Sequence, residues 1–293
     1  MIALRQLLVD VERRLQQAGV ESARTDAELL LAHVLGVTRS GLFIVDQLSD
    51  EQFHQYELLV RRRVLREPLQ YITGIAGFRK IELKVGPGVL VPRPETELLV
   101  EIVKRFGKSG FVLDLGAGSG CIGLSIAVEM PDMQVITVEN SVEALEYLKV
   151  NVAEHSKILQ DASSVEILPI SISELTQAKS ELIGNVQVIA ANPPYVPLGS
   201  SVAAEVQYFE PVTAVFADQH GYSVIDEVIQ TAKEFLAAGG LLVIEHHETQ
   251  GLSGKDQGVA GRLRRIGGFT NITSIDDLTN RPRFTYAYRE SLS

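Results

Sequence analysis

Strands that alternate with helices along most of the chain restrict its fold more than any other feature. From Gly110 onward, short apolar runs rich in valine, isoleucine and leucine are each followed by a segment with helical spacing. Parallel strands need long crossover connections, and helices usually supply them. The pattern therefore predicts an α/β fold in which helices cover both faces of a mostly parallel sheet. The apolar runs are "FVLDL", "MQVITV", "VEILPI", "NVQVIAA" and "GGLLVIEH".

The two ends of the chain depart from this alternation. The runs "NITSIDDL" and "RPRFTYAYR" are separated by a short connection, so we expect an antiparallel hairpin at the sheet edge. Residues 1–75 carry helical spacing instead, and Ser49 followed by Gln52 fits a capping box. The cationic run "RRRVLRE" is expected to end that helix and to face water.

These patterns divide the sequence into three parts. Residues 1–75 form a small all-helical domain, residues 76–108 form a linking region with a hairpin and a helix, and residues 109–293 form the α/β domain. A chain of 293 residues, 45% of them hydrophobic, is long enough to bury a core in each of two domains.

Charge and cysteine content narrow the classes of function. The formal net charge of −10 disfavours a protein whose main task is to grip phosphates, because such proteins are more often basic. Cys121 is the only cysteine, so no internal disulfide can form and a reduced, cytoplasmic location is expected. No apolar run approaches the roughly 18 residues of a membrane-spanning helix, and no His, Cys and Asp cluster has metal-ligand spacing. We therefore expect no membrane association and no metal.

The stretch "LDLGAGSG", residues 113–120, follows a buried strand and opens a helix. Glycines allow close approach of the backbone to a ligand, and a helix N-terminus offers free N–H groups. A nicotinamide-type fingerprint would need glycine at the position of Cys121. Asp114 within the stretch, and Glu139 at the end of the next strand, suit a different nucleotide-like ligand whose ribose hydroxyls a carboxylate can bind.

This combination resembles the S-adenosylmethionine site of class I methyltransferases. The resemblance implies a Rossmann-like methyltransferase sheet, S-adenosyl-L-methionine as cofactor and S-adenosyl-L-homocysteine as product. It also implies a set of cofactor-binding residues, namely Gly116, Ala117, Gly118, Ser119, Gly120, Glu139, Ile172 and Asn192.

A second motif, "NPPY", leaves the strand "NVQVIAA" at Asn192. Prolines stiffen the backbone, and the residue before a proline is pushed into an extended conformation, so Asn192 is held in a fixed pose. Methyltransferases with this motif act on a planar, conjugated nitrogen. The side-chain oxygen of Asn192 and the carbonyl of Pro193 can accept its two N–H groups, and Tyr195 can pack against the flat substrate. We expect Asn192, Pro193 and Tyr195 to be catalytic and, together with Pro194, to bind the substrate.

Two substrate classes share the motif: glutamine amides in proteins and adenine amino groups in nucleic acids. The wider sequence decides between them, because five stretches occur in a specific order: "EPLQYITGIAGF", "VPRPETE", "DLGAGSG", "NPPYV" and "FEPVTAVFADQHG". With them the chain closely resembles the peptide chain release factor N(5)-glutamine methyltransferases over almost its whole length.

The resemblance implies that the partner is a bacterial class 1 peptide chain release factor, methylated on the glutamine of its Gly-Gly-Gln motif. Residues 1–75 would then recognise the release factor, residues 109–293 would form the methyltransferase domain, and no nucleic acid would be a direct substrate. An adenine-N(6) methyltransferase is the alternative, and it would have to flip its base or use single strands. A protein that binds the cofactor and a translation factor without turnover is a third reading, which the intact Asn192 disfavours.

Some positions depart from the pattern of that family. Glu139 stands where the family usually has Asp, and its longer side chain is expected to shift the ribose. Ser171 and Ile172 replace an Asp followed by an aromatic residue, so we expect apolar packing and backbone contacts to hold the adenine. His247 stands at a usual glycine, and both His246 and His247 are expected to be structural.

Overall fold

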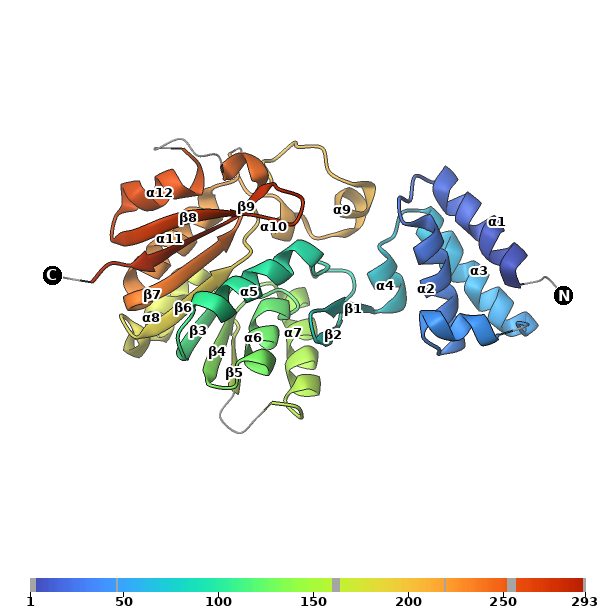
Figure 1. The fold of residues 1–293 in the computed structure, drawn as a ribbon, viewed down its shortest axis with the longest axis horizontal. Coiled ribbons are helices and arrows are strands. Elements are labelled where there is room, and N and C mark those ends of the chain that lie inside the picture. Colours follow the sequence, from blue (N-terminus) through green and yellow to red (C-terminus); the bar gives the residue numbers. More distant parts are fainter. Residues whose placement is uncertain (1–3, 46, 160–163, 219, 252–256, 292–293) are drawn as a thin grey trace. The chain divides into compact units, whose positions relative to one another are not determined.

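A seven-stranded sheet organises the larger part of the molecule (Figure 1). The computed structural model describes residues 4–45, 47–159, 164–218, 220–251 and 257–291. The strand order is β5-β4-β3-β6-β7-β9-β8. The first five strands in this order pair in parallel, whereas β9 pairs antiparallel with both β7 and β8. This order confirms the predicted mostly parallel sheet with an antiparallel hairpin at its edge. The strands are β3 (Gly110–Leu115), β4 (Met133–Val138), β5 (Ser164–Leu168), β6 (Val186–Ala191), β7 (Leu236–Glu245), β8 (Phe269–Asp276) and β9 (Pro282–Arg289).

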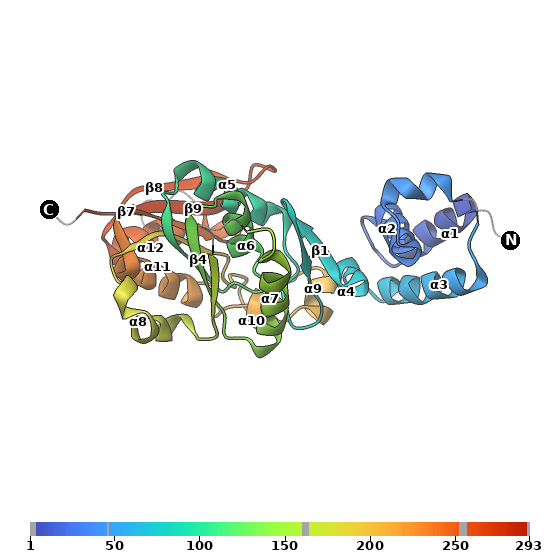
Figure 2. The ribbon, with the colours of Figure 1, turned by 90° about the horizontal axis from the view of Figure 1, so that it is seen from below.

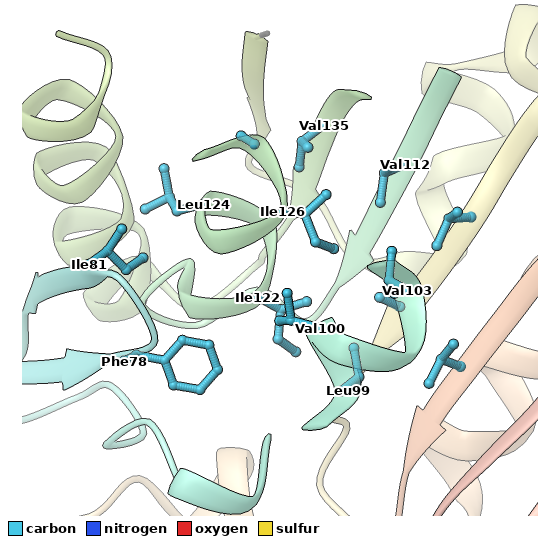
Figure 3. Close-up of a cluster of buried hydrophobic side chains, with 14 of the residues drawn as sticks. Phe78, Ile81, Leu99, Val100, Val103, Val112, Ile122, Leu124, Ile126 and Val135 are labelled. Atoms are coloured by element: carbon cyan, nitrogen blue, oxygen red, sulfur yellow. The ribbon is translucent and has the colours of Figure 1, made fainter. Parts of the chain in front are cut away.

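Helices pack on both faces of this sheet (Figures 1 and 2). Side chains alternate between the two faces of a strand, so neighbouring residues such as Val112 and Leu113 enter different cores. The core that contains Val112 is closed by α5 (Glu97–Phe106), α6 (Cys121–Glu129) and α7 (Val142–His155), and Figure 3 shows it from within. The core that contains Leu113 is closed by α8 (Leu175–Ala178), α11 (Ser223–Phe235) and α12 (Gly258–Ile266).

The parallel register aligns the carboxyl ends of five strands. Leu115 of β3 pairs with Val138 of β4 on one side and with Ala191 of β6 on the other. Val138 pairs in turn with Leu168, and Ala191 with Ile244. The next residue along β3, β4, β6 and β7 is a glycine, a glutamate, an asparagine and a glutamate respectively. The chain also reverses its direction of travel at β3, since β4 and β6 lie on opposite sides of it, and open α/β sheets bind ligands at such switch points.

A two-stranded sheet precedes α5. The run "GFRKIELKV", whose alternation is typical of one strand, is divided between β1 (Ile75–Phe78) and β2 (Ile81–Lys84), which pair with each other. Arg79 adopts a positive φ of 51° at the turn, an uncommon conformation for a residue with a side chain. Its guanidinium donates to both carboxylate oxygens of Glu129 and to the carbonyl of Glu97, contacts that hold the turn.

The N-terminal helices enclose a core of their own, around Val11, Leu30 and Tyr56. Ser49 and Gln52 form the predicted capping box, with both reciprocal hydrogen bonds present. Gly36 ends the second helix in a left-handed conformation that favours glycine. The helices are α1 (Leu4–Gln17), α2 (Ala23–Leu35), η1 (Arg39–Ile44), α3 (Asp50–Val64) and α4 (Leu69–Thr73).

The structure separates into two compact units, and the chain passes from one unit to the other three times. One unit comprises residues 1–75 together with residues 202–209, and the other comprises residues 76–201 and 210–293. The short helix α9 (Ala204–Phe209) thus joins the N-terminal helices, although it follows them by more than a hundred positions in the sequence. We refer to residues 1–75 and 202–209 as the helical unit. Across the described residues, no helix is both long enough and apolar enough to cross a membrane.

An ion-pair cluster ties α9 to this unit. Glu205 accepts hydrogen bonds from Arg63 and Arg66, with nitrogen–oxygen distances of 2.5–2.8 Å. Arg63 also donates to Asp26 at 2.7 Å, and its side chain is only 6% exposed. The expectation that the run "RRRVLRE" faces water is therefore wrong for Arg63. Its partner Glu205 lies 142 positions away, so nothing in the local sequence could signal the burial.

Replacing Glu205 with Gln should destabilise the helical unit at pH 7, because two arginines lose a shared negative charge. Removing one partner of a buried ion pair costs about 3–5 kcal/mol, and we expect roughly the lower limit, since the Glu205 side chain remains 18% exposed. Burial alone raises the pKa of Glu205, but hydrogen bonds from Arg66 and Arg63 outweigh it and lower the pKa to about 2. The wild-type advantage should therefore be present above the ordinary glutamate pKa of 4.5 and disappear as the pH falls toward 2.

Urea unfolding at pH 7 and pH 3 measures this difference. Glu248→Gln is the control, because the pair of Glu248 with Arg281 is well exposed and its loss should change stability by about 0–1 kcal/mol. Equal unfolding midpoints for the two variants at pH 7 would contradict a stabilising role of Glu205.

Candidate active site

A cavity of about 590 Å³ lies at the carboxyl ends of the parallel strands. Its volume falls within the range of small-molecule sites. Loops that follow β3, β4, β5 and β6 line it, and so does the segment that leads into α5. Nine residues predicted for the site lie together on this lining: Gly116, Ala117, Gly118, Ser119, Glu139, Ile172, Asn192, Pro193 and Pro194.

The glycine loop after β3 serves two different purposes. Gly116 and Gly118 have positive φ values, and a Cβ atom built on either would meet open space, with no atom closer than 3.9 Å. These two positions therefore leave room for a ligand against the backbone. Gly120 also has a positive φ, but a Cβ there would lie 2.7 Å from Leu148 of α7. Gly120 does not line the cavity, and its missing side chain allows α7 to pack closely.

Glu139 joins the loop after β3 to the loop after β4. One carboxylate oxygen accepts the backbone N–H of Gly118 at 2.8 Å, and the other accepts the N–H groups of Asn140 and Ser141, each at 2.8 Å. Three backbone donors thus fix the orientation of the carboxylate beside the cavity. The oxygen bound to Gly118 retains a lone pair for a further donor.

A buried carboxyl group supports the glycine loop from below. Asp114 is fully buried and accepts the N–H of Gly123 at 2.8 Å, which holds the first turn of α6. Burial raises the pKa of Asp114 to about 7. Half-buried Cys121, at the start of α6, lines the cavity, and desolvation raises the pKa of its thiol.

The segment after β5 places apolar side chains on the cavity. Ser171 caps the short helix η3 (Ile172–Glu174), and its hydroxyl and N–H both donate to Glu174. Its polar groups are therefore used within the segment. Ile170 and Ile172 line the cavity on either side of it.

Asn192 takes part in a hydrogen-bond chain that the sequence did not reveal. Its Nδ2 donates to Oγ1 of Thr96 at 3.1 Å, and the Thr96 hydroxyl donates to Oε2 of Glu245 at 2.7 Å. The hydroxyl of Tyr195 donates to the other Glu245 oxygen at 3.2 Å. Tyr195 does not line the cavity, but this bond connects it to Asn192 through two intervening side chains.

Glu245 is almost completely buried, with 1% of its surface exposed. Burial raises its pKa to about 7, although the Thr96 hydrogen bond and the nearby Arg283 act in the opposite direction. Burial together with the Glu245 charge also raises the pKa of Tyr195, which stays protonated and remains a donor. Neither Glu245 nor Thr96 is among the site residues predicted from the sequence. Glu245 is marked only as an acidic residue at the end of an apolar strand, and Thr96 only by its place in "VPRPETE".

The two histidines after β7 make local contacts. Nδ1 of buried His246 donates to the carbonyl of His247 at 3.0 Å, so its Nε2 accepts from the Thr285 hydroxyl at 2.8 Å. Burial lowers the pKa of His246 to about 4, which keeps the ring neutral. His247 has an extended backbone that requires no glycine, and its side chain accepts the N–H of Thr249. Both rings therefore stabilise the turn.

Comparison with known proteins identifies the family of the chain. The family model described as PrmC N-terminal domain matches residues 6–74, and the model described as Methyltransferase small domain matches residues 93–208. The release factor glutamine methyltransferase of Mycolicibacterium smegmatis is 37% identical over 291 residues, which is 99% of each chain. Those of Streptomyces coelicolor and Bifidobacterium longum are each 38% identical, and the alignments cover 94% of this chain and 94% and 95% of theirs. The chain therefore belongs to the release factor glutamine methyltransferase family and is an S-adenosylmethionine-dependent methyltransferase.

Proposed function

We propose that this enzyme methylates the side-chain amide nitrogen of the glutamine in the Gly-Gly-Gln motif of class 1 peptide chain release factors. One observation carries the proposal: the "NPP" segment and the glycine loop with Glu139 line the same cavity. A methyl donor and an amide can therefore meet within it. The names of the close relatives support a release factor glutamine as the substrate.

The chain offers a fitting place for the donor. The open backbone at Gly116 and Gly118 can take a ligand in close contact. The free lone pair of Glu139 can accept a ribose hydroxyl, and Ile172 offers an apolar surface to a base. S-Adenosylmethionine supplies an already activated methyl group on its sulfonium sulfur, so no strong base is required of the protein.

The chain's task is then to hold the amide. An amide nitrogen is a poor nucleophile because its lone pair is delocalised into the carbonyl. Acceptors at Oδ1 of Asn192 and at the carbonyl of Pro193 can bind its two N–H groups and orient the nitrogen. Such positioning can supply up to about 7–11 kcal/mol of barrier reduction. Tyr195 does not line the cavity, so it would act on Asn192 through Glu245 and Thr96 rather than by the expected packing against the flat substrate.

Incubation of the enzyme with S-adenosylmethionine and a purified class 1 release factor tests the proposal. Peptide mass analysis should find one methyl group on the glutamine of the Gly-Gly-Gln loop. A release factor that stays unmodified while single-stranded DNA gains N(6)-methyladenine would replace the proposal with the adenine activity.

Changing Asn192 to Ala should abolish detectable methyl transfer but leave donor affinity almost intact, because the lost acceptor serves the substrate amide. An unpaired buried donor costs roughly 1–3 kcal/mol, and misorientation of the nitrogen adds to this. Single-turnover kinetics and calorimetric titration with S-adenosylmethionine separate the two effects. Near-normal turnover in the variant would rule out the clamp.

Changing Glu139 to Ala should weaken binding of S-adenosylmethionine. Hydrogen bonds to a charged group contribute roughly 1.5–3 kcal/mol, which is about 10- to 150-fold in Kd. Glu139→Asp is the matched control, because it keeps a carboxylate and should retain most of the affinity. An unchanged Kd in the Ala variant would mean that Glu139 does not hold the ribose.

The helical unit should dock a second surface of the release factor. A glycine-rich loop loses about 1–2 kcal/mol per residue when it is ordered, and contacts elsewhere on the partner can offset this. Phe43 and Ile44 on η1 are 92% and 85% exposed, so they are suited to such a contact. The double change to Ser should lower kcat/KM for the intact factor but not for a short Gly-Gly-Gln peptide.

Leu278 provides a matched control for this double change. It is 96% exposed and lies in the other unit, so Leu278→Ser should leave both substrates unaffected. Point changes are preferable to deletion of residues 1–75, because deletion would remove the partners of Glu205. Equal kcat/KM for the double variant and the Leu278 variant on the intact factor would remove η1 from the recognition surface.

A further inference from the structure

We propose that Glu245, acting through Thr96, sets which end of the Asn192 amide faces the substrate. The two residues would then be positioning residues for the methyl transfer, a role that rests on the proposed function. They form a relay in which Glu245 fixes the direction of the Thr96 hydroxyl, and Thr96 in turn fixes the Asn192 side chain.

A count of protons along the relay determines the direction of each hydrogen bond. An ionised carboxylate can only accept, so the single hydroxyl proton of Thr96 goes to Oε2 of Glu245, 2.7 Å away. Thr96 Oγ1 can then only accept from Asn192, which must offer Nδ2 at the observed distance of 3.1 Å. The carbonyl oxygen of the Asn192 amide is thereby left for the substrate.

The "NPPY" motif itself does not determine which end of the Asn192 amide faces the substrate. The oxygen and nitrogen of an amide are similar in size, so packing alone does not distinguish the two orientations. The prolines after Asn192 fix its backbone but leave the last side-chain torsion free. A reversed amide would point its N–H groups at the N–H groups of the substrate, and the acceptor on which the clamp depends would be lost.

The placement of the relay follows from the sheet. Asn192 and Glu245 each follow one residue after the paired Ala191 and Ile244, whose side chains enter the core beneath α11 and α12. Because side chains alternate along a strand, Asn192 and Glu245 are directed to the opposite face. Thr96, at the N-terminus of α5, lies on that face and bonds to both.

Several charged or titratable groups surround the Glu245 carboxylate. Arg283 on β9 supplies positive charge, while Glu95 beside Thr96 supplies negative charge. The Tyr195 hydroxyl donates to Glu245, and Arg93 and the Cys121 thiol lie within electrostatic reach of this pair.

With a pKa raised by burial to about 7, Glu245 loses its charge as the pH falls through neutrality. A protonated carboxyl can donate to Thr96, whose proton can then turn to the Asn192 oxygen, so turnover should fall on the acid side.

The experiment compares wild type with Thr96→Ser, Thr96→Val and Glu245→Gln on an intact release factor from pH 6 to 8.5. Thr96→Ser keeps the hydroxyl and should retain kcat within about twofold. Thr96→Val leaves Asn192 Nδ2 unpaired and should lower kcat roughly 5- to 150-fold, with donor Kd unchanged. Wild-type kcat at saturating donor should decline below about pH 7, and Glu245→Gln should remove this pH dependence, because its side chain no longer titrates.

Asp114→Asn is the matched control for the pH profile. Asp114 also has a raised pKa of about 7, but it lies beneath the glycine loop and contacts Gly123. This variant should keep the acid decline in kcat. If instead it loses the decline and Glu245→Gln keeps it, the titration belongs to the donor loop and the relay is refuted.

The outcomes also separate this inference from the proposed function. If the wild-type enzyme does not methylate the release factor, both the proposed function and the relay are refuted. A wild-type enzyme that does so, with Thr96→Val equally fast or Glu245→Gln showing the wild-type pH profile, removes only the relay. Should Thr96→Val fail to fold, kcat of Thr96→Ser and the pH dependence of kcat in Glu245→Gln still test the relay.

Discussion

The register of five parallel strands is the constraint on which the rest of the site depends. A row of paired residues, from Leu168 through Leu115 to Ile244, crosses the sheet at one level. The residues immediately after this row on β3, β4, β6 and β7 are Gly116, Glu139, Asn192 and Glu245. A slip of one residue in any strand would turn its last side chain to the other face. The apolar cores on both faces therefore hold the polar groups of the site in place.

The carboxylates at this level are held by hydrogen bonds from several directions. Buried Glu245 accepts hydroxyls from Thr96, the N-cap of α5, and from Tyr195 in the loop after β6. Half-buried Glu139 accepts three backbone N–H groups. An unpaired charge in such a position would be strongly destabilising. The same bonds that make burial tolerable also restrict rotation, so stability and the orientation of the site have a common origin. Pre-organised groups of this kind need no rearrangement during the reaction.

The helical unit is built from two segments that lie far apart in the sequence. Residues 202–209 leave the larger unit a few positions after the "NPPY" motif, fold with the N-terminal helices, and return. Hydrogen bonds from Arg63 and Arg66 to Glu205 attach this segment to the N-terminal helices. A segment that follows the "NPPY" motif is therefore held by residues from the N-terminal part of the sequence.

The sequence by itself determined the kind of sheet, the loops that line its cavity and the family, because each depends on local periodicity or on short motifs. It could not determine Thr96, Glu245 or the burial of Arg63. The bonds from Thr96 to Glu245 and to Asn192, and from Arg63 to Glu205, span 96 to 149 positions, and one hydrogen bond over such a distance leaves no periodic trace. The position of the hairpin turn at Arg79 likewise depends on Glu129, 50 positions away. Only the tertiary structure decided these contacts, because strand register and helix packing, rather than local preference, bring the two partners together.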